Sequence, residues 1–352
     1  MEANSRNAMK QRPECNSRSV GFQPLCFIGR LVGWKPTLRL LAVAFLGAGL
    51  PAAAGTVIIV TGAPGEAEFA DTFTKQAAAW KEAAEKGGAR VVEIGGGAED
   101  AKNPDVEKLH AALAAEKPDG TEPLWVVLNG HGTWDGKVAR FNLRGPDVSD
   151  DELAAWLQPV KRPAVIINAA SSSAPFLAKL SGPGRIVITA TRSGSEQNFA
   201  RFGGFLAASL TDAAADLDTD GAVSVLEAFL MAARRTAEFY KSEGRLMTEH
   251  ALIEDNGDGL GTPADWFKGL RAVKKSDKNA AVDGAAARHF YLIAPAAEKE
   301  WTAEQIKERE TLEARVAALR EAKATMKEDD YYEKLEPLLL ELARLTQRAS
   351  EK

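Results

Sequence analysis

Three consecutive serines, beginning at Ser171, follow one residue after the apolar run 164–169, which is typical of a buried strand. An earlier apolar run, residues 123–132, ends in His131 and Gly132. A serine hydroxyl beside an imidazole is the combination from which hydrolases build a nucleophile and its general base. Glycine lets the backbone approach a substrate, so the amides of Gly132 and Ser171 are the candidate oxyanion donors. The alternative is that the histidine is only a turn residue at a strand end.

The stretch 216–227 has the residue order of an EF-hand calcium loop. Oxygen donors occupy positions one, three, five, seven, nine and twelve, and a glycine occupies position six. The predicted ligands are Asp216, Asp218, Asp220, Ala222 through its carbonyl, Ser224 and Glu227. The alternative is a solvated acidic loop, but four crowded carboxylates repel one another when no cation is bound. We therefore predict Ca²⁺ as the cofactor.

A second stretch, residues 254–265, follows the same register less closely. Side-chain oxygens again occupy positions one, three, five and nine, and a glycine again occupies position six. Glu254 stands at position one, however, and the shorter Asp265 stands at position twelve, where EF-hand loops carry a glutamate. The frequent pairing of EF-hands favours this loop and the two end positions weaken it, so whether it binds calcium is left open.

The elements that must position these residues follow from hydrophobic periodicity. Strands are predicted at 56–65, 90–97, 123–132, 164–169 and 185–194, with a short hairpin arm at 137–143. Helices are predicted at 67–86, 104–116 and 150–160. The chain after residue 200 reads as helical, including 202–211 and 225–240, but two Asp/Gly-rich segments interrupt it. Alternating strands and helices predict an α/β fold with a mainly parallel sheet covered on both faces. His131 and Ser171 would face one crevice if their strands are neighbours.

These motifs resemble the legumain and caspase type of cysteine peptidase, in which one strand ends in a catalytic His-Gly and another in Ala-Cys-x-Ser-Gly. His131-Gly132 matches the first motif. The best alignment of the second is Ala170 to Ala174, with Ser171 in place of the cysteine, although a shift of one residue would put Ala170 there. The resemblance covers roughly 56–262, including GPDVSDDEL and ITATRSG, and implies a three-layer caspase-like fold.

The resembled family builds part of its specificity pocket after the fifth strand. Arg192 and Glu196 occupy this segment, 190–199, and would read a charged side chain of a substrate. The alternative, which we favour slightly, is that the two side chains pair with each other.

The replacement of the cysteine decides what activity we expect. A thiol ionises readily beside an imidazole, whereas a serine hydroxyl keeps its proton until a base removes it in the transition state. Serine enzymes usually orient their histidine with an acid, and no such partner is evident, because Asp135 lies in a Trp-Asp-Gly turn. We therefore expect an inactive or weak peptidase-like protein that binds peptides or proteins. The alternative is an active peptidase or acyl hydrolase with a Ser171–His131 dyad.

The first 54 residues read as a leader. Lys35 and Arg39 precede the apolar run 40–50, and Pro51 with three alanines matches a small-residue cleavage site. This pattern predicts export to the periplasm or the extracellular space, with membrane contact only through an uncleaved signal. Both cysteines precede the cleavage point, so the mature chain would have no thiol and no disulfide. The net charge of −5 gives no support for nucleic-acid binding.

The chain therefore divides into a leader (1–54), the α/β domain with its acidic loop (55–273), a polar linker (274–300) and a C-terminal segment (301–352). This last segment begins with a capping-box pattern, from Thr302 to Gln305, and carries apolar residues at heptad-like spacing. It predicts a helical hairpin or short coiled coil, kinked at Pro337. The hairpin either packs on its own domain or mediates homo-oligomerisation.

Overall fold

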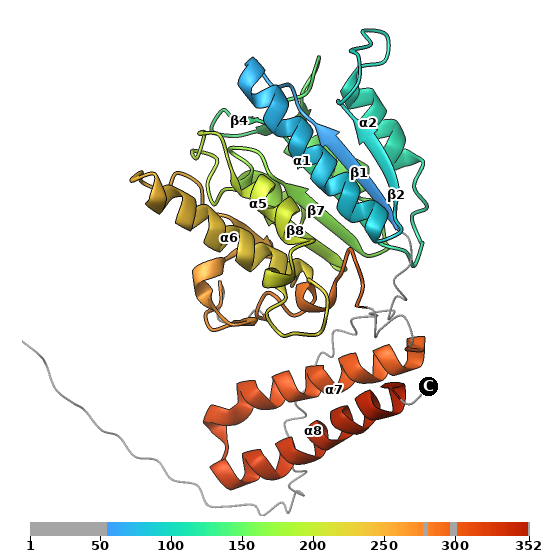
Figure 1. Ribbon diagram of the computed structural model, residues 1–352, viewed down its shortest axis with the longest axis vertical. Coiled ribbons are helices and arrows are strands. Elements are labelled where there is room, and N and C mark those ends of the chain that lie inside the picture. Colours follow the sequence, from blue (N-terminus) through green and yellow to red (C-terminus); the bar gives the residue numbers. More distant parts are fainter. Residues whose placement is uncertain (1–54, 277–280, 296–300, 351–352) are drawn as a thin grey trace, which may run out of the picture. The chain divides into compact units, whose positions relative to one another are not determined.

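The computed structural model describes residues 55–276, 281–295 and 301–350, so the predicted leader lies outside the described residues. Seven strands form one sheet in the order β10-β9-β8-β7-β3-β1-β2. Five of them pair in parallel, namely β1 (Thr56–Thr61), β2 (Arg90–Ile94), β3 (Leu124–Asn129), β7 (Ala164–Asn168) and β8 (Arg185–Thr189). The predicted mainly parallel α/β sheet is confirmed, and Figure 1 shows its layers.

The sheet is sandwiched between two groups of helices (Figure 1). Alternate residues of the central strands face opposite sides, so Val57 packs into one core and Ile58 into the other. One face is covered by α1 (Ala67–Lys86), α5 (Phe202–Ser209) and α6 (Val225–Ser242). The other is covered by α2 (Asp105–Ala114), α3 (Asp150–Leu157) and α4 (Ala174–Leu180). Because both faces are buried, the central strands read as continuous apolar runs rather than alternating ones.

The region after residue 200 differs from the helical prediction. The chain there adds two short antiparallel edge strands, β9 (Leu252–Glu254) and β10 (Thr262–Pro263). Strands of three and two residues are too short to leave a periodic signal in the sequence. Helix α4 was likewise not predicted, because its seven residues make barely two turns.

A second, three-stranded sheet follows β3 directly. It consists of β4 (Gly132–Trp134), β5 (Ala139–Phe141) and β6 (Val148–Ser149), all antiparallel. The predicted hairpin arm at 137–143 is confirmed as β5. Gly132 therefore lies where the chain leaves the main sheet and enters this small sheet.

Part of the predicted polar linker contributes to the domain core. Strands β11 (Phe267–Lys268) and β12 (Arg271–Ala272) form a β-ribbon. The segment that follows this ribbon in the sequence contains one turn of 3₁₀-helix, Ala287–His289. Ala287 and Leu292 are buried in the same core as α5 and α6, and the Trp125 and Phe290 rings lie 5.6 Å apart. The apolar residues of this segment are separated by polar ones, so the sequence does not indicate that they pack into the core.

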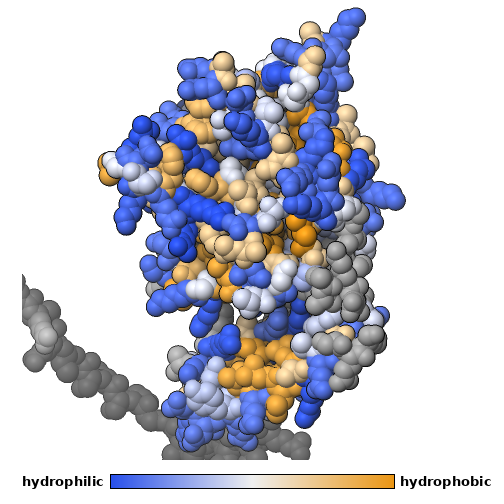
Figure 2. All heavy atoms as spheres, in the orientation of Figure 1, coloured by the Kyte–Doolittle hydropathy of each residue, from blue (hydrophilic) through white to orange (hydrophobic). Residues whose placement is uncertain are grey.

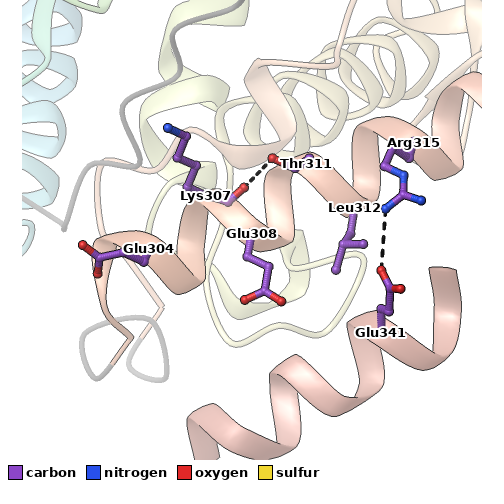
Figure 3. Close-up of a pocket in the computed structure, with 7 residues that line it drawn as sticks. All are labelled: Glu304, Lys307, Glu308, Thr311, Leu312, Arg315 and Glu341. Atoms are coloured by element: carbon purple, nitrogen blue, oxygen red, sulfur yellow. Dashed lines mark hydrogen bonds and ion pairs between the residues drawn. The ribbon is translucent and has the colours of Figure 1, made fainter. Parts of the chain in front are cut away.

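The C-terminal segment forms two helices in contact, α7 (Ala303–Ala322) and α8 (Glu328–Ser350), with Pro337 inside α8. The predicted capping box at Thr302 is confirmed. The hairpin core contains Leu312, Val316, Leu338 and Leu345. Apolar side chains also gather on its surface (Figure 2). One pocket on this hairpin is lined mainly by charged side chains, among them the Arg315–Glu341 ion pair of 3.6 Å (Figure 3).

No helix in the described ranges is both long enough and apolar enough to cross a membrane.

Candidate functional site

The two strands that end in the candidate dyad are direct neighbours. Strands β3 and β7 pair in parallel, with Leu128 opposite Asn168, and the Ala169 amide donates to the Leu128 carbonyl. His131 and Ser171 each lie three residues beyond this last pair of partners. The fold therefore brings both predicted residues to the same edge of the sheet, as the strand order requires.

The Ser171 hydroxyl is turned towards the backbone of Gly132. Its Oγ accepts the Gly132 N–H at 3.2 Å and donates to the Gly132 carbonyl at 3.0 Å. Ser171 is only 3 % exposed. The hydroxyl thus acts as a clamp between the turn after β7 and the start of β4, and it engages the Gly132 amide that was predicted to bind an oxyanion. Its single proton is directed to a carbonyl, which is no general base.

His131 lies among aromatic rings. The imidazole is edge-on to Phe69 and Phe73, with ring centroids 4.7 and 5.0 Å away, and Phe199 completes the enclosure at 5.9 Å. Burial lowers the pKa of His131, and a hydrogen bond to the Pro64 carbonyl partly opposes this. The ring is therefore kept neutral and oriented by Pro64. The helix periodicity placed Phe69 and Phe73 on one face of a helix without showing that this face meets His131.

The other two serines have distinct environments. Ser173 shares a hydrogen bond with the Thr191 hydroxyl at 3.1 Å, whereas the Oγ of Ser172 is buried without a partner. Ser172 also has a positive φ of 52°, and its amide donates to the Glu196 carbonyl at 2.8 Å. A left-handed conformation is unfavourable for a residue with a Cβ, so the turn after β7 is strained. The run of serines gave no sign of which one would carry this strain.

Arg192 and Glu196 pair with each other. Arg192 Nε lies 3.4 Å from Glu196 Oε1, and the Arg192 amide donates to Oε2 at 3.0 Å. The same carboxylate contacts His250 Nδ1 at 2.6 Å. Glu196 therefore acts as the centre of a small network that fixes this loop, while the Arg192 side chain remains 60 % exposed.

The acidic loop gathers its carboxylates as the sequence pattern predicts. Oxygen atoms of Asp216, Asp218 and Glu227 lie within 4.8 Å of one another, a grouping that can hold a metal ion. Burial, with Glu227 and Asp220 nearby, raises the pKa of Asp218. A hard divalent cation binds oxygen donors of this kind and would relieve that repulsion.

The remaining predicted ligands lie in the same loop. Asp220 Oδ1 accepts the amide of Ala222 at 2.9 Å, and its Oδ2 accepts the Tyr291 hydroxyl at 2.7 Å. Ser224 is the N-cap of α6, where it forms a reciprocal capping box with Glu227. This box explains locally why the helix begins where the loop ends. The predicted helix after the loop is confirmed, and the loop is preceded by α5 and a 3₁₀ turn at Ala213–Ala215.

No protein-family model matches the sequence, and no curated protein matches it. Among solved structures, the Drosophila initiator caspase Dronc matches 67 % of this chain and 95 % of its own, at 15 % sequence identity and a TM-score of 0.38. Nothing about activity follows from a likeness of this size.

Proposed function

We propose that this chain is an exported calcium-binding protein whose peptidase-like sheet edge binds peptides or proteins without cleaving them. The observation that carries the proposal is the double hydrogen bond between the Ser171 hydroxyl and the Gly132 backbone. Export stays a prediction, because the leader lies outside the described residues.

Three requirements of serine catalysis argue for an inactive site. A nucleophile must reach the substrate, and Ser171 is 3 % exposed. Its proton must pass to a base, and it is directed to the Gly132 carbonyl instead. An oxyanion hole needs a preorganised amide, and the Gly132 amide is already engaged. Each requirement would have to be met by rearranging the same clamp.

The surroundings of His131 support binding instead. Phe69 and Phe199 are half-buried, with ring centroids 4.9 Å apart, and the Arg201 guanidinium lies 5.5 Å from the Phe199 ring. Aromatic residues, including phenylalanine, and arginine are enriched at protein interfaces. An apolar or aromatic side chain of an extended peptide is therefore the ligand type that this edge would accept.

Calcium would support the domain that carries this edge. The loop 216–227 lies between α5 and α6, which both cover the sheet, and Glu227 caps α6. A cation held by Asp216, Asp218 and Glu227 would fix the start of that helix. Calcium sites of extracellular modules typically have dissociation constants of about 10⁻⁴–10⁻³ M, which suits an exported protein.

Active-site labelling tests the inactive reading. The mature protein is treated with a fluorophosphonate probe beside a known serine hydrolase, and we expect no labelled Ser171. Labelling of Ser171 that disappears in His131→Ala would establish the alternative, a Ser171–His131 hydrolase.

Calorimetric titration with CaCl₂ tests the proposed calcium binding separately. Absence of binding heat together with an unchanged melting temperature in EDTA would contradict it.

A further inference from the structure

The second acidic stretch, residues 254–265, shares the left-handed positions of the loop 216–227. In the first loop, positions four and six have positive φ angles, 59° at Thr219 and 89° at Gly221. In the second, the same positions are Gly257 at 82° and Gly259 at 75°. The second loop therefore turns in the same way, although it follows strand β9 rather than a helix.

The two loops also direct their amides to equivalent carboxylates. The position-five amide donates to the position-one carboxylate in both, from Asp220 to Asp216 at 3.2 Å and from Asp258 to Glu254 at 3.1 Å. The position-seven amide donates to the position-five carboxylate in both, from Ala222 to Asp220 at 2.9 Å and from Leu260 to Asp258 at 2.7 Å. Glu254 thus replaces an aspartate at position one without changing the turn.

Position twelve is where the loops differ. Glu227 is buried in the first loop, whereas its counterpart Asp265 is exposed. In the first loop, Glu227 accepts the position-two amide of Leu217 at 2.8 Å and the position-nine hydroxyl of Ser224 at 2.7 Å. These two contacts define what a position-twelve carboxylate does in this fold.

Asp283, from a later segment of the chain, makes both contacts in the second loop. Its Oδ1 accepts the position-two amide of Asp255 at 3.1 Å, and its Oδ2 accepts the position-nine hydroxyl of Thr262 at 2.5 Å. The Asp255 carboxylate holds this segment in place by accepting three amides, those of Gly284, Ala286 and Ala287, each at 2.8 Å. Asp283 is only 3 % exposed.

One oxygen inside this arrangement lacks a partner. The Glu254 side chain is completely buried, and while Oε1 accepts amides of the loop, Oε2 has no hydrogen-bond partner. A buried carboxylate oxygen without a partner is costly unless a cation binds it.

We propose that residues 254–265 form a second calcium site, completed by Asp283 in place of Asp265. The donors would be Glu254, the Asn256 side-chain oxygen, Asp258, the Leu260 carbonyl, Thr262 and Asp283. Asn256 is oriented for this role, since its amide nitrogen donates to the Ala281 carbonyl at 3.0 Å and its Oδ1 is turned into the loop. Among the described residues, only the first loop brings three carboxylates within 4.8 Å of one another, so this site binds calcium more weakly.

Calorimetric titration of the mature chain with CaCl₂ tests the proposal, using Glu227→Gln to remove the first site. We expect two sites in the unmodified chain and one weaker site in Glu227→Gln. Adding Asp283→Asn should weaken that remaining site at least about tenfold, since altering groups that merely support a metal ligand already costs 10–100-fold. Adding Asp265→Asn instead should leave it unchanged.

The outcomes separate this inference from the proposed function. If only the loop 216–227 fails to bind calcium, one site would remain. This site would be unchanged in Glu227→Gln and lost in Asp283→Asn. The inference is overturned if Glu227→Gln abolishes all binding, or if Asp265→Asn removes the second site. Should Asp283→Asn not fold, as judged by circular dichroism, Glu254→Gln is the second variant, and unchanged affinity in that folded variant would equally overturn it.

Discussion

The sheet edge at Ser171 and the acidic loop 216–227 both carry side chains of types found in functional sites. The two regions differ in whether the protein itself supplies the partners of these side chains. At the sheet edge, the Ser171 hydroxyl is matched by the Gly132 backbone within the chain. In the loop, three acidic residues bring oxygens of like charge within 4.8 Å of one another. A matched hydroxyl needs no ligand, whereas gathered carboxylates are stabilised by one. The residue types indicate where a site could be. Whether their hydrogen bonds and charges are already balanced within the protein decides whether the site needs a ligand.

The largest test of this contrast removes the loop's closing carboxylate. With free calcium at 100 times the dissociation constant, a bound ion stabilises the chain by about 2.7 kcal/mol. Glu227→Gln should lose most of this gain while keeping the helix cap, because glutamine also serves in a capping box. Melting temperatures in CaCl₂ and in EDTA measure the difference. Glu238→Gln, an exposed position on the same helix, is the control, and an equal calcium shift in both variants would contradict the assignment.

The second test breaks the clamp at the sheet edge. Ser171→Ala leaves the Gly132 N–H and carbonyl without their partner, which should lower the free energy of unfolding by about 1–3 kcal/mol. Urea denaturation measures this loss. Ser195→Ala is the matched control, because that exposed hydroxyl bonds only within its own turn. A Ser171→Ala variant as stable as the parent would show that the hydroxyl is not a structural clamp and would reopen its catalytic role.

The third test compares the two residues other than glycine that have a positive φ in the described part of the chain, one in each region. Ser172→Gly relieves a left-handed residue and removes a buried hydroxyl without a partner, so it should stabilise the chain by up to about 1 kcal/mol. Thr219→Gly should gain less, because the Thr219 hydroxyl donates to the Asp218 carbonyl at 2.7 Å. Thermal unfolding of both variants checks the order, and a destabilised Ser172→Gly would mean that the hydroxyl has a function in the turn.

The smallest effect concerns pH at the sheet edge. Burial lowers the pKa of His131 below its ordinary value of 6.5, so the unfolded chain takes up the proton first as pH falls. The contribution of this imidazole is therefore present above pH 6.5 and is lost as pH falls through 6.5 towards the folded-state pKa.

Nuclear magnetic resonance titration of the imidazole measures this pKa directly. Urea unfolding of His131→Phe between pH 8 and pH 5 should show a weaker dependence on pH than the parent chain. A His131 pKa above 6.5 would instead indicate a nearby negative group, as an active dyad with an acidic partner requires.

The sequence predicted whatever depends on local or periodic features. Helix α1 was predicted with its observed bounds, because its apolar residues recur every three or four positions. The strand prediction was correct because continuous apolar runs bounded by turns are typical of buried parallel strands. Elements such as β9 and α4 were missed, because they contain too few residues to show a period.

The sequence by itself determined the five parallel strands of the sheet, the strand ends that carry His131 and Ser171, and the order of oxygen donors in the first loop. Only the tertiary structure decided that Ser171 turns towards Gly132 and that Asp283 reaches the second loop. Both contacts join residues far apart in the chain, 39 positions in the first case and 21 between Asp283 and Thr262 in the second. Spacing reveals neighbours along one element, whereas the direction of a side chain between elements is set by how those elements pack.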